Sequence, residues 1–218
     1  MKFFIDTANI DEIKEAKQLG ILDGVTTNPS LMAKVGIKGE EAIREHYRKI
    51  CELVDGPVSA EVISTDFDSM MAEARALASI DRRIVVKIPM IPDGVKALSA
   101  LRDEGIATNC TLVFSAGQAL LAAKAGATYV SPFIGRIDDI TWDGIALIEE
   151  IVEIYEIQGF DTEVLAASIR SARHIVEAAR AGADIVTCPL ASIKGLFKHP
   201  LTDIGLEKFL SDFRRSQD

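Results

Sequence analysis

Eight short segments with the composition of β-strands recur along the chain, and their spacing constrains the fold more than any other feature. Each is rich in β-branched and other apolar residues, and successive segments begin about 20–35 residues apart. This interval fits right-handed βαβ units, in which a helix returns the chain to the start of the next parallel strand. The predicted strands are residues 2–6, 24–28, 58–63, 84–89, 107–113, 128–134, 162–168 and 183–189.

Helical patterns fill the intervals, and the predicted helices include residues 40–54, 69–79, 95–104, 118–125, 144–157 and 172–181. Ser115 and Gln118 have the spacing of a capping box, and Asn9 and Glu12 form a looser version. Eight such units predict an α/β fold, a single-domain (β/α)8 TIM barrel over residues 1–218. The alternative is an open doubly wound sheet, which has fewer strands and often a glycine-rich nucleotide turn. The sequence contains neither GxGxxG nor GxxxxGKS/T.

Residues 201–218 follow the last predicted strand and are expected to form an extra C-terminal helix. Leu206, Phe209, Leu210 and Phe213 recur at the i, i+3, i+4, i+7 spacing of one helix face. This apolar face has two possible partners, its own barrel or a neighbouring subunit.

Composition limits the partners and the compartment. A net charge of −9 argues against nucleic acid or an anionic membrane surface, so an anionic substrate needs a local binding site. The three cysteines are widely spaced, without a CxxC pair, which indicates neither a disulfide framework nor a zinc site. The N-terminal apolar run reaches Asp6 too early for a signal peptide, and no run approaches membrane-spanning length. We therefore expect a cytoplasmic protein with reduced thiols.

Lys87 lies in the middle of the predicted strand at residues 84–89, among β-branched residues. Burying an ammonium group is costly unless it is paired or its pKa falls, and a neutral lysine is the nucleophile of Schiff-base chemistry. The alternative is a lysine that reaches solvent or pairs with a carboxylate. Burial and nearby acids act on its pKa in opposite directions, and the sequence leaves that balance open.

In each of the other strands, the polar residues lie at alternate positions and therefore share one face. We take this to be the face that carries Lys87 in its own strand. Barrel interiors are normally filled by Val, Ile and Leu, so these polar residues predict a site at the carboxyl ends of the strands. The predicted inward residues are Asp6, Thr26, Asn28, Ser59, Glu61, Asn109, Thr111, Ser131, Ser168 and Arg170, and the opposite parity includes Val25, Val62, Val86, Leu112, Ile134 and Ile169.

Several of these residues also have ordinary structural explanations. Asp6 is placed to cap the next helix, and Glu61 is a possible ion-pair partner of Lys87. Asn28 before a proline suits a turn, and Arg136 and Arg170 fit solvated loop charges. Together, however, a lysine, two carboxylates, amides, hydroxyls and two arginines match imine formation, proton transfer and phosphate binding.

Six motifs, in order on successive strands, resemble the transaldolase family, in particular its small-subunit members related to fructose-6-phosphate aldolase. They are FIDTAN at residues 4–9, GVTTNPS at 24–30, VKIP at 86–89, TNCTLVFS at 108–115, VSPFIGR at 130–136 and AASIR at 166–170. The resemblance spans nearly the whole chain.

The resemblance implies that Lys87 forms an imine with a ketose carbonyl, with no metal and no organic cofactor. Asp6 would then take or relay the proton of the hydroxyl at the cleaved carbon, and Glu61 with Thr111 would position a water. Substrate-binding residues would include Thr26 and Phe133. Asn28, Asn109 and Ser131 would hold the dihydroxyacetone fragment, and Arg136, Ser168 and Arg170 the phosphate.

Glu61 and Phe133 favour the transferase branch of the family, because aldolase members have glutamine and tyrosine there. The expected activity is therefore that of a transaldolase of the pentose phosphate pathway. The alternatives are a fructose-6-phosphate aldolase that releases free dihydroxyacetone, and a phospho-sugar-binding barrel without catalysis. The resemblance also implies a homo-oligomer, a pentamer or decamer, in which the terminal helix reaches a neighbour.

Overall fold

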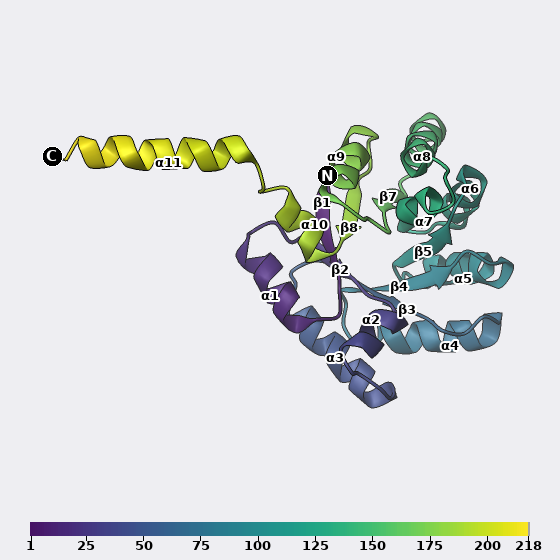
Figure 1. Cartoon of the computed structure of the whole chain (residues 1–218). Coiled ribbons are helices and arrows are strands. Elements are labelled where there is room, and N and C mark those ends of the chain that lie inside the picture. The colour runs from purple at the N-terminus through teal and green to yellow at the C-terminus, as the bar shows by residue number, and fades with distance from the viewer. Residues whose placement is uncertain (218) are drawn as a thin grey trace.

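Eight parallel strands form a closed barrel in the structure of this chain, a computed structural model that describes residues 1–217 (Figure 1). Each strand pairs with the next in sequence, and β1 pairs with β8 to close the sheet. The strands are β1 (Lys2–Asp6), β2 (Gly24–Thr26), β3 (Val58–Glu61), β4 (Ile84–Pro89), β5 (Thr108–Val113), β6 (Tyr129–Pro132), β7 (Glu163–Ala166) and β8 (Ile185–Cys188). The predicted (β/α)8 barrel is confirmed, and the open-sheet alternative is wrong.

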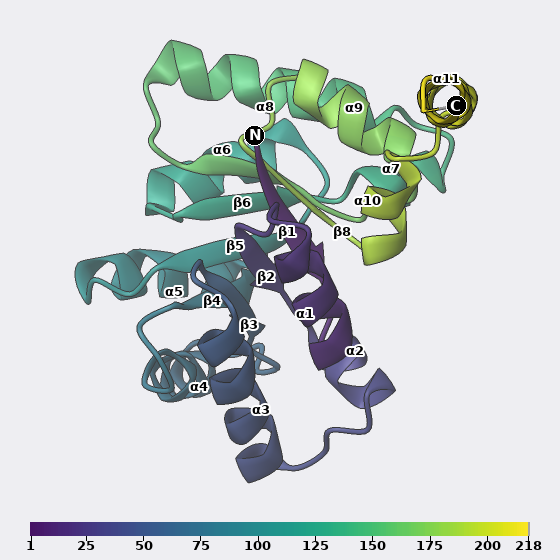
Figure 2. The ribbon, with the colours of Figure 1, turned by 90° about the vertical axis from the view of Figure 1, so that its left-hand side faces the viewer.

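Helices surround the barrel, as the view along a different axis shows (Figure 2). They are α1 (Ile10–Gln18), α2 (Pro29–Lys34), α3 (Glu40–Leu53), α4 (Phe67–Ala78), α5 (Pro92–Asp103), α6 (Ala116–Ala125), α7 (Ile134–Asp138), α8 (Gly144–Gln158), α9 (Ala172–Arg180), α10 (Leu190–Gly195) and α11 (Pro200–Arg215). The six long predicted helices are present with small shifts at their ends. The short helices α2, α7 and α10 were not predicted, and each begins just after a strand ends.

Most predicted strands extend beyond the observed ones at their carboxyl ends. In the segments predicted at residues 24–28 and 162–168, the observed strands end at Thr26 and Ala166. Asn28 instead caps α2, where its Oδ1 accepts a hydrogen bond of 2.9 Å from the Leu31 amide. Ser168 has a φ of 60°, which takes the chain out of the extended conformation. The chain therefore leaves the sheet where the polar residues begin.

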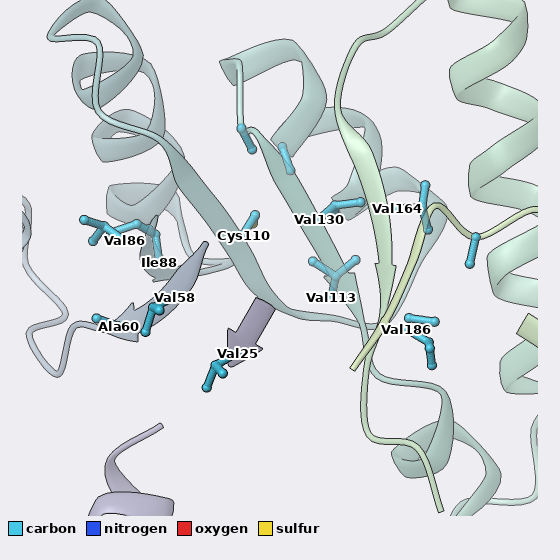
Figure 3. Close-up of a cluster of buried hydrophobic side chains, with 14 of the residues drawn as sticks. Val25, Val58, Ala60, Val86, Ile88, Cys110, Val113, Val130, Val164 and Val186 are labelled. Atoms are coloured by element: carbon cyan, nitrogen blue, oxygen red, sulfur yellow. The ribbon is translucent and has the colours of Figure 1, made fainter. Parts of the chain in front are cut away.

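The side chains on the two faces of the strands pack into two different apolar clusters. Val25, Val58, Val86, Val130 and Val186 belong to the large cluster between the strands and the helices (Figure 3). A second cluster fills the barrel interior, where the Phe4 and Tyr129 rings pack edge to face with centroids 6.2 Å apart. Side chains alternate between these clusters with the predicted parity except in β7, where Leu165 lies in the interior cluster and Val164 and Ala166 lie in the outer one, so the parity predicted for that strand is wrong.

The helix α11 extends away from the barrel (Figure 1), and none of its residues, among those that the structure describes, is buried. The face formed by Leu206, Phe209, Leu210 and Phe213 is 47–73% exposed. Packing of this face on its own barrel is therefore wrong. Within the described chain, every helix falls short of the length or hydropathy that crossing a membrane requires.

Candidate active site

A cavity of about 680 Å³ opens at the carboxyl ends of the strands. This end of the barrel is the usual place for the active site of a TIM-barrel enzyme. The predicted site residues that line it are Asp6, Thr26, Asn28, Glu61, Lys87, Ser131, Phe133, Arg136, Ser168 and Arg170. The other two, Asn109 and Thr111, are buried behind the lining.

Lys87 lies on the floor of this cavity and is only 5% exposed. It sits beside Glu61 in the register of β3 and β4, and its Nζ is 2.9 Å from Glu61 Oε2. Nζ also donates to the Thr27 carbonyl at 3.4 Å. The predicted pair with Glu61 is present, and the amine still borders the cavity. An amine held in this way can attack a carbonyl group with a carboxylate next to it for proton transfer.

A second layer fixes the Thr27 carbonyl that accepts from Lys87. The Thr27 hydroxyl bonds to the Ser59 carbonyl at 2.9 Å and shares a 2.9 Å contact with Tyr47 Oη. Burial raises the pKa of Tyr47 to about 12, so its phenol stays neutral. These contacts fix the backbone just after β2 against β3 and α3, next to Lys87.

Asp6 accepts a hydrogen bond of 2.7 Å from the Thr26 hydroxyl, which is itself 2.7 Å from Thr187 Oγ1. Burial raises the pKa of Asp6, while the Thr26 hydrogen bond and the charge of Lys87 act in the opposite direction. Asn9, not Asp6, caps α1 by accepting from the amides of the first turn. The helix-capping explanation of Asp6 is therefore wrong, and its carboxyl group faces the cavity.

Asn109 links two hydroxyl groups below the cavity. Its Nδ2 donates to Ser59 Oγ at 3.2 Å, and its Oδ1 accepts from Ser131 Oγ at 2.7 Å. Ser131 itself lines the cavity. Asn28 also lines the cavity while its side chain caps α2.

The end of β5 departs from the predicted alternation. The β5–β6 register shifts between Cys110 and Val113, and Leu112 has a φ of 60°. This bulge turns Leu112 into the cavity lining, so its predicted outward position is wrong. Ile169 is also in the lining, and it has the same parity as Leu165 and Ala167, which face the barrel interior, so its predicted outward position is wrong. Thr111 Oγ1 is buried without a hydrogen-bond partner among residues 1–217.

Two arginines lie on the wall formed by α7 and the loop after β7. The Arg136 guanidinium carbon is 5.0 Å from the centroid of the Phe133 ring, and that ring is 6.0 Å from Lys87 Nζ. Arg170 donates from Nη2 to Asp139 Oδ2 at 2.7 Å. Both side chains line the cavity. Paired guanidinium groups suit a phosphate.

Lys34 and Thr187 also line the cavity and were missed in the sequence. Thr187 shares the inward parity of β8, so the alternation rule applied to that strand would have found it. Lys34 lies in α2, which is too short to show periodicity, so the sequence carries no signal for its position.

Comparisons with known proteins agree on one family. A family model described as Transaldolase/Fructose-6-phosphate aldolase matches residues 3–217. A protein of Phocaeicola vulgatus named "Probable transaldolase" is 63% identical over 215 residues, which is 99% of each chain. Proteins with the same name from Bacteroides fragilis and Cytophaga hutchinsonii are also 63% identical over 99% of each chain.

Among solved structures, inosine 5' monophosphate dehydrogenase from Legionella pneumophila is similar, with a TM-score of 0.58 and 17% identity. The match covers 85% of this chain and 57% of that chain. At this identity the likeness concerns the barrel fold alone.

Proposed function

This chain belongs to the transaldolase/fructose-6-phosphate aldolase family, and from that premise we propose that it is a transaldolase acting through a Schiff base. The proposed reaction converts fructose 6-phosphate and erythrose 4-phosphate into sedoheptulose 7-phosphate and glyceraldehyde 3-phosphate. The observation that carries it is the buried amine of Lys87, 2.9 Å from Glu61, in a cavity with two arginines on its wall.

In the first half-reaction, Lys87 Nζ attacks the C2 carbonyl of the ketose, and loss of water leaves a protonated imine. Asp6 removes the proton of the C4 hydroxyl, the C3–C4 bond breaks, and its electron pair moves to the imine nitrogen. Glyceraldehyde 3-phosphate leaves, and a dihydroxyacetone enamine stays bound to Lys87. Glu61 and Thr111 position the water that is released when the imine forms and that is needed again when the imine is hydrolysed.

In the second half-reaction, the enamine carbon attacks the aldehyde carbon of erythrose 4-phosphate, and Asp6 returns its proton to the new alkoxide. Water then hydrolyses the imine and frees Lys87 for the next cycle. Asn28, Asn109 and Ser131 bind the dihydroxyacetone unit, and Thr26 orients Asp6 through their 2.7 Å hydrogen bond. Arg136, Ser168 and Arg170 bind the phosphate of the aldehyde half.

Glu61 and Phe133 support the transferase over the aldolase. An aldolase must protonate the enamine carbon to release dihydroxyacetone, whereas a transferase must protect that carbon until the acceptor arrives. The Phe133 ring lies 6.0 Å from Lys87 Nζ and has no ionisable proton. It therefore covers the bound enamine without offering a route for protonation.

Product analysis tests this proposal. The protein is incubated with fructose 6-phosphate, with and without erythrose 4-phosphate, and the products are measured by mass spectrometry. Sedoheptulose 7-phosphate should form only with the acceptor, with little free dihydroxyacetone. Rapid dihydroxyacetone release without the acceptor would instead identify an aldolase.

Borohydride trapping separates catalysis from simple binding. Reduction in the presence of fructose 6-phosphate should leave a covalent three-carbon adduct on Lys87, and Lys87→Met should abolish both the adduct and the activity. A phospho-sugar-binding barrel would bind the substrate and give no adduct.

We also propose that the protein works in the cytoplasm as a homo-oligomer. The exposed apolar face of α11 supports the oligomer, because Leu206, Phe209, Leu210 and Phe213 together leave a contiguous stripe unburied. The buried thiols of Cys51, Cys110 and Cys188 suit a reducing compartment.

A further inference from the structure

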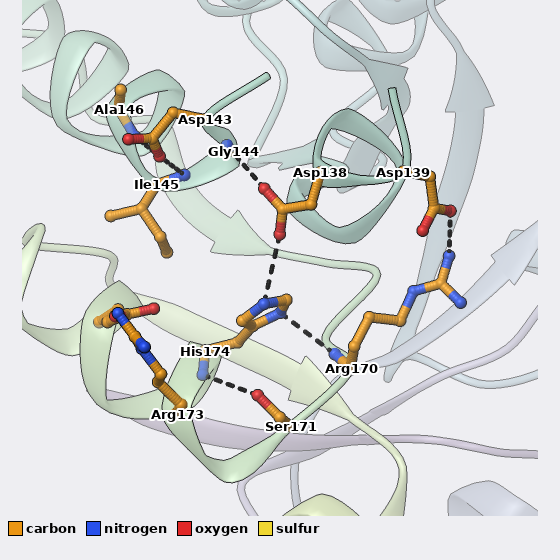
Figure 4. A network of polar contacts seen from close by, with 11 residues as sticks. Asp138, Asp139, Asp143, Gly144, Ile145, Ala146, Arg170, Ser171, Arg173 and His174 are labelled. Carbon is orange, nitrogen blue, oxygen red and sulfur yellow. Dashed lines mark hydrogen bonds and ion pairs between the residues drawn. The ribbon is translucent and has the colours of Figure 1, made fainter. Parts of the chain in front are cut away.

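The two arginines of the proposed phosphate site lie in separate elements. Their spacing therefore depends on the contacts that fix one element relative to the other. Arg136 lies in α7, whereas Arg170 lies in the loop between β7 and α9. His174, in the first turn of α9, lies between the two elements (Figure 4). It contacts backbone and side chains around the cavity, but it does not line the cavity itself.

The imidazole of His174 contacts both elements. The Arg170 amide donates to Nδ1 at 3.3 Å, and Nε2 is 3.2 Å from Asp138 Oδ2 at the end of α7. Because Nδ1 accepts a hydrogen bond, the ring proton lies on Nε2, which donates to Asp138. The ring therefore connects the Arg170 backbone to the helix that carries Arg136.

Both ends of this connection are anchored. Asp138 Oδ1 accepts from the Gly144 amide at 3.0 Å, which ties α7 to the start of α8. The His174 amide donates to Ser171 Oγ at 3.3 Å, which caps α9 and fixes the ring relative to the loop. Figure 4 shows these contacts in a row from Gly144 to Ser171.

The helix α7 and the loop after β7 are closely packed, so the positions of Arg136 and Arg170 depend on how these two elements lie against each other. A Cβ added at Gly135 would lie 2.1 Å from the Ser168 carbonyl and 2.8 Å from Arg170 Cγ, so the loop lies directly on α7. The Arg170 guanidinium reaches over to Asp139. A small rotation of the loop would therefore change the separation of the two guanidinium groups.

We propose that His174 is a positioning residue that sets the spacing of Arg136 and Arg170 for the phosphate of the substrate. The inference rests on the proposed function of the cavity. His174 touches no reacting atom, so it should affect the binding of phosphorylated substrates and leave the chemical step at Lys87 unchanged.

The kinetic test compares an acceptor that carries a phosphate with one that lacks it. KM and kcat are measured for erythrose 4-phosphate and for erythrose, with saturating fructose 6-phosphate, in the wild type and in His174→Ala. The variant should raise KM for erythrose 4-phosphate about 3- to 10-fold, the effect of one or two lost hydrogen bonds. Its kcat, and its KM for erythrose, should stay within about 2-fold of the wild type.

His174→Asn is the conservative variant, because Asn Oδ1 can replace Nδ1 as the acceptor for the Arg170 amide. The Asn side chain loses the contact between Nε2 and Asp138, so its KM for erythrose 4-phosphate should lie between those of the wild type and the Ala variant. His199→Ala is the matched control, since it removes an imidazole that lies outside the cavity lining and, within the described chain, has no hydrogen bond or ion pair with α7 or the loop after β7. Equal changes for both acceptors, or an Asn variant no better than the Ala variant, would overturn the proposal.

Titration with inorganic phosphate by calorimetry keeps this test independent of catalysis. His174→Ala should weaken phosphate binding by the same 3- to 10-fold, with His174→Asn between the Ala variant and the wild type and His199→Ala close to the wild type. If the wild type lacks transaldolase activity, the proposed function fails, and the titration still decides the role of His174. No phosphate binding by the wild type, or unchanged binding in the Ala variant, would refute that role.

Discussion

Asp6, the proposed proton acceptor, carries a cost to the stability of the fold. Burial raises its pKa above the 3.8 of an ordinary aspartate, and Thr26 and Lys87 only partly oppose this effect. Because the pKa in the folded state is raised, the ionised carboxylate destabilises the fold, and protonation removes that penalty as the pH falls through the folded pKa. The site thus holds a proton acceptor with more basicity than a solvated aspartate.

Asp6→Asn is expected to lower kcat about 10²- to 10⁴-fold, the usual contribution of a general base. The acid limb of the kcat/KM profile of the wild type should lie above pH 3.8 and disappear in the variant. At pH 7 the variant should have a higher free energy of unfolding, because the amide still accepts from Thr26 without a buried charge. Denaturant unfolding measures this difference, and a less stable variant would contradict the argument.

Phe133→Tyr places a phenol above Lys87 and should shift the products towards free dihydroxyacetone. We expect the ratio of release to transfer to rise at least about 10-fold, because a phenol can deliver the proton that the enamine carbon needs. The ratio is measured by mass spectrometry with limiting erythrose 4-phosphate.

Phe114→Tyr is the control for this substitution. The Phe114 ring packs against Phe133 with centroids 5.8 Å apart, but Phe114 is outside the cavity lining. An equal change in both variants would show that the phenol acts through packing and not through proton delivery.

Alternation along the strands is what made Lys87, Glu61 and Ser131 predictable, because their strands are regular up to these residues. Leu112 was placed on the wrong face because a bulge with a positive φ interrupts the alternation of β5. Ile169 was placed on the wrong face because the parity of β7 was taken from Ser168, and the positive φ of Ser168 breaks the alternation that Leu165 and Ala167 follow. Non-glycine residues rarely adopt that conformation, so the sequence contains no sign of it.

At the level of elements, the short helix α7 positions the cavity wall that carries the two arginines. It follows β6 directly, carries Arg136, and lies against the loop of Arg170 without room for a side chain at Gly135. Helices of five or six residues make fewer than two turns, so hydrophobic periodicity could not reveal α2, α7 or α10. The long helices were predictable because α3 and α8 repeat their apolar positions over several turns.

Gly135→Ala should separate α7 from the loop after β7. The added methyl group clashes with the Ser168 carbonyl, so we expect a loss of about 1–3 kcal/mol in the free energy of unfolding. KM for erythrose 4-phosphate should also rise more than KM for erythrose.

Gly117→Ala is the matched control, because Gly117 is likewise the second residue of its helix. Its added Cβ would meet only Ser115 Oγ, at 4.0 Å, so this change should be neutral or stabilising by up to about 1 kcal/mol. A similar loss of stability in both variants would argue against the clash.

At the scale of the whole molecule, α11 adds no described residue to the buried core of the barrel. Deletion of residues 199–218 should leave the melting temperature of the barrel nearly unchanged, because none of the α11 residues in the described chain is buried. The same deletion should reduce the full-length oligomer to a monomer, measured by light scattering after size exclusion. A monomeric full-length chain, or a truncated chain that still oligomerises, would contradict this assignment.

The pairing of β1 with β8 also fixes the order in which the site is completed during synthesis. β1 and β4, with Asp6 and Lys87, leave the ribosome early, but β1 finds its second partner only when Cys188 has been made. Closing a loop of this length is slow in comparison with local helix formation, and unpaired strand edges stay open until then. A nascent chain therefore carries Lys87 long before it has a barrel to enclose it, and closure both protects the sheet edges and brings Thr187 to Thr26.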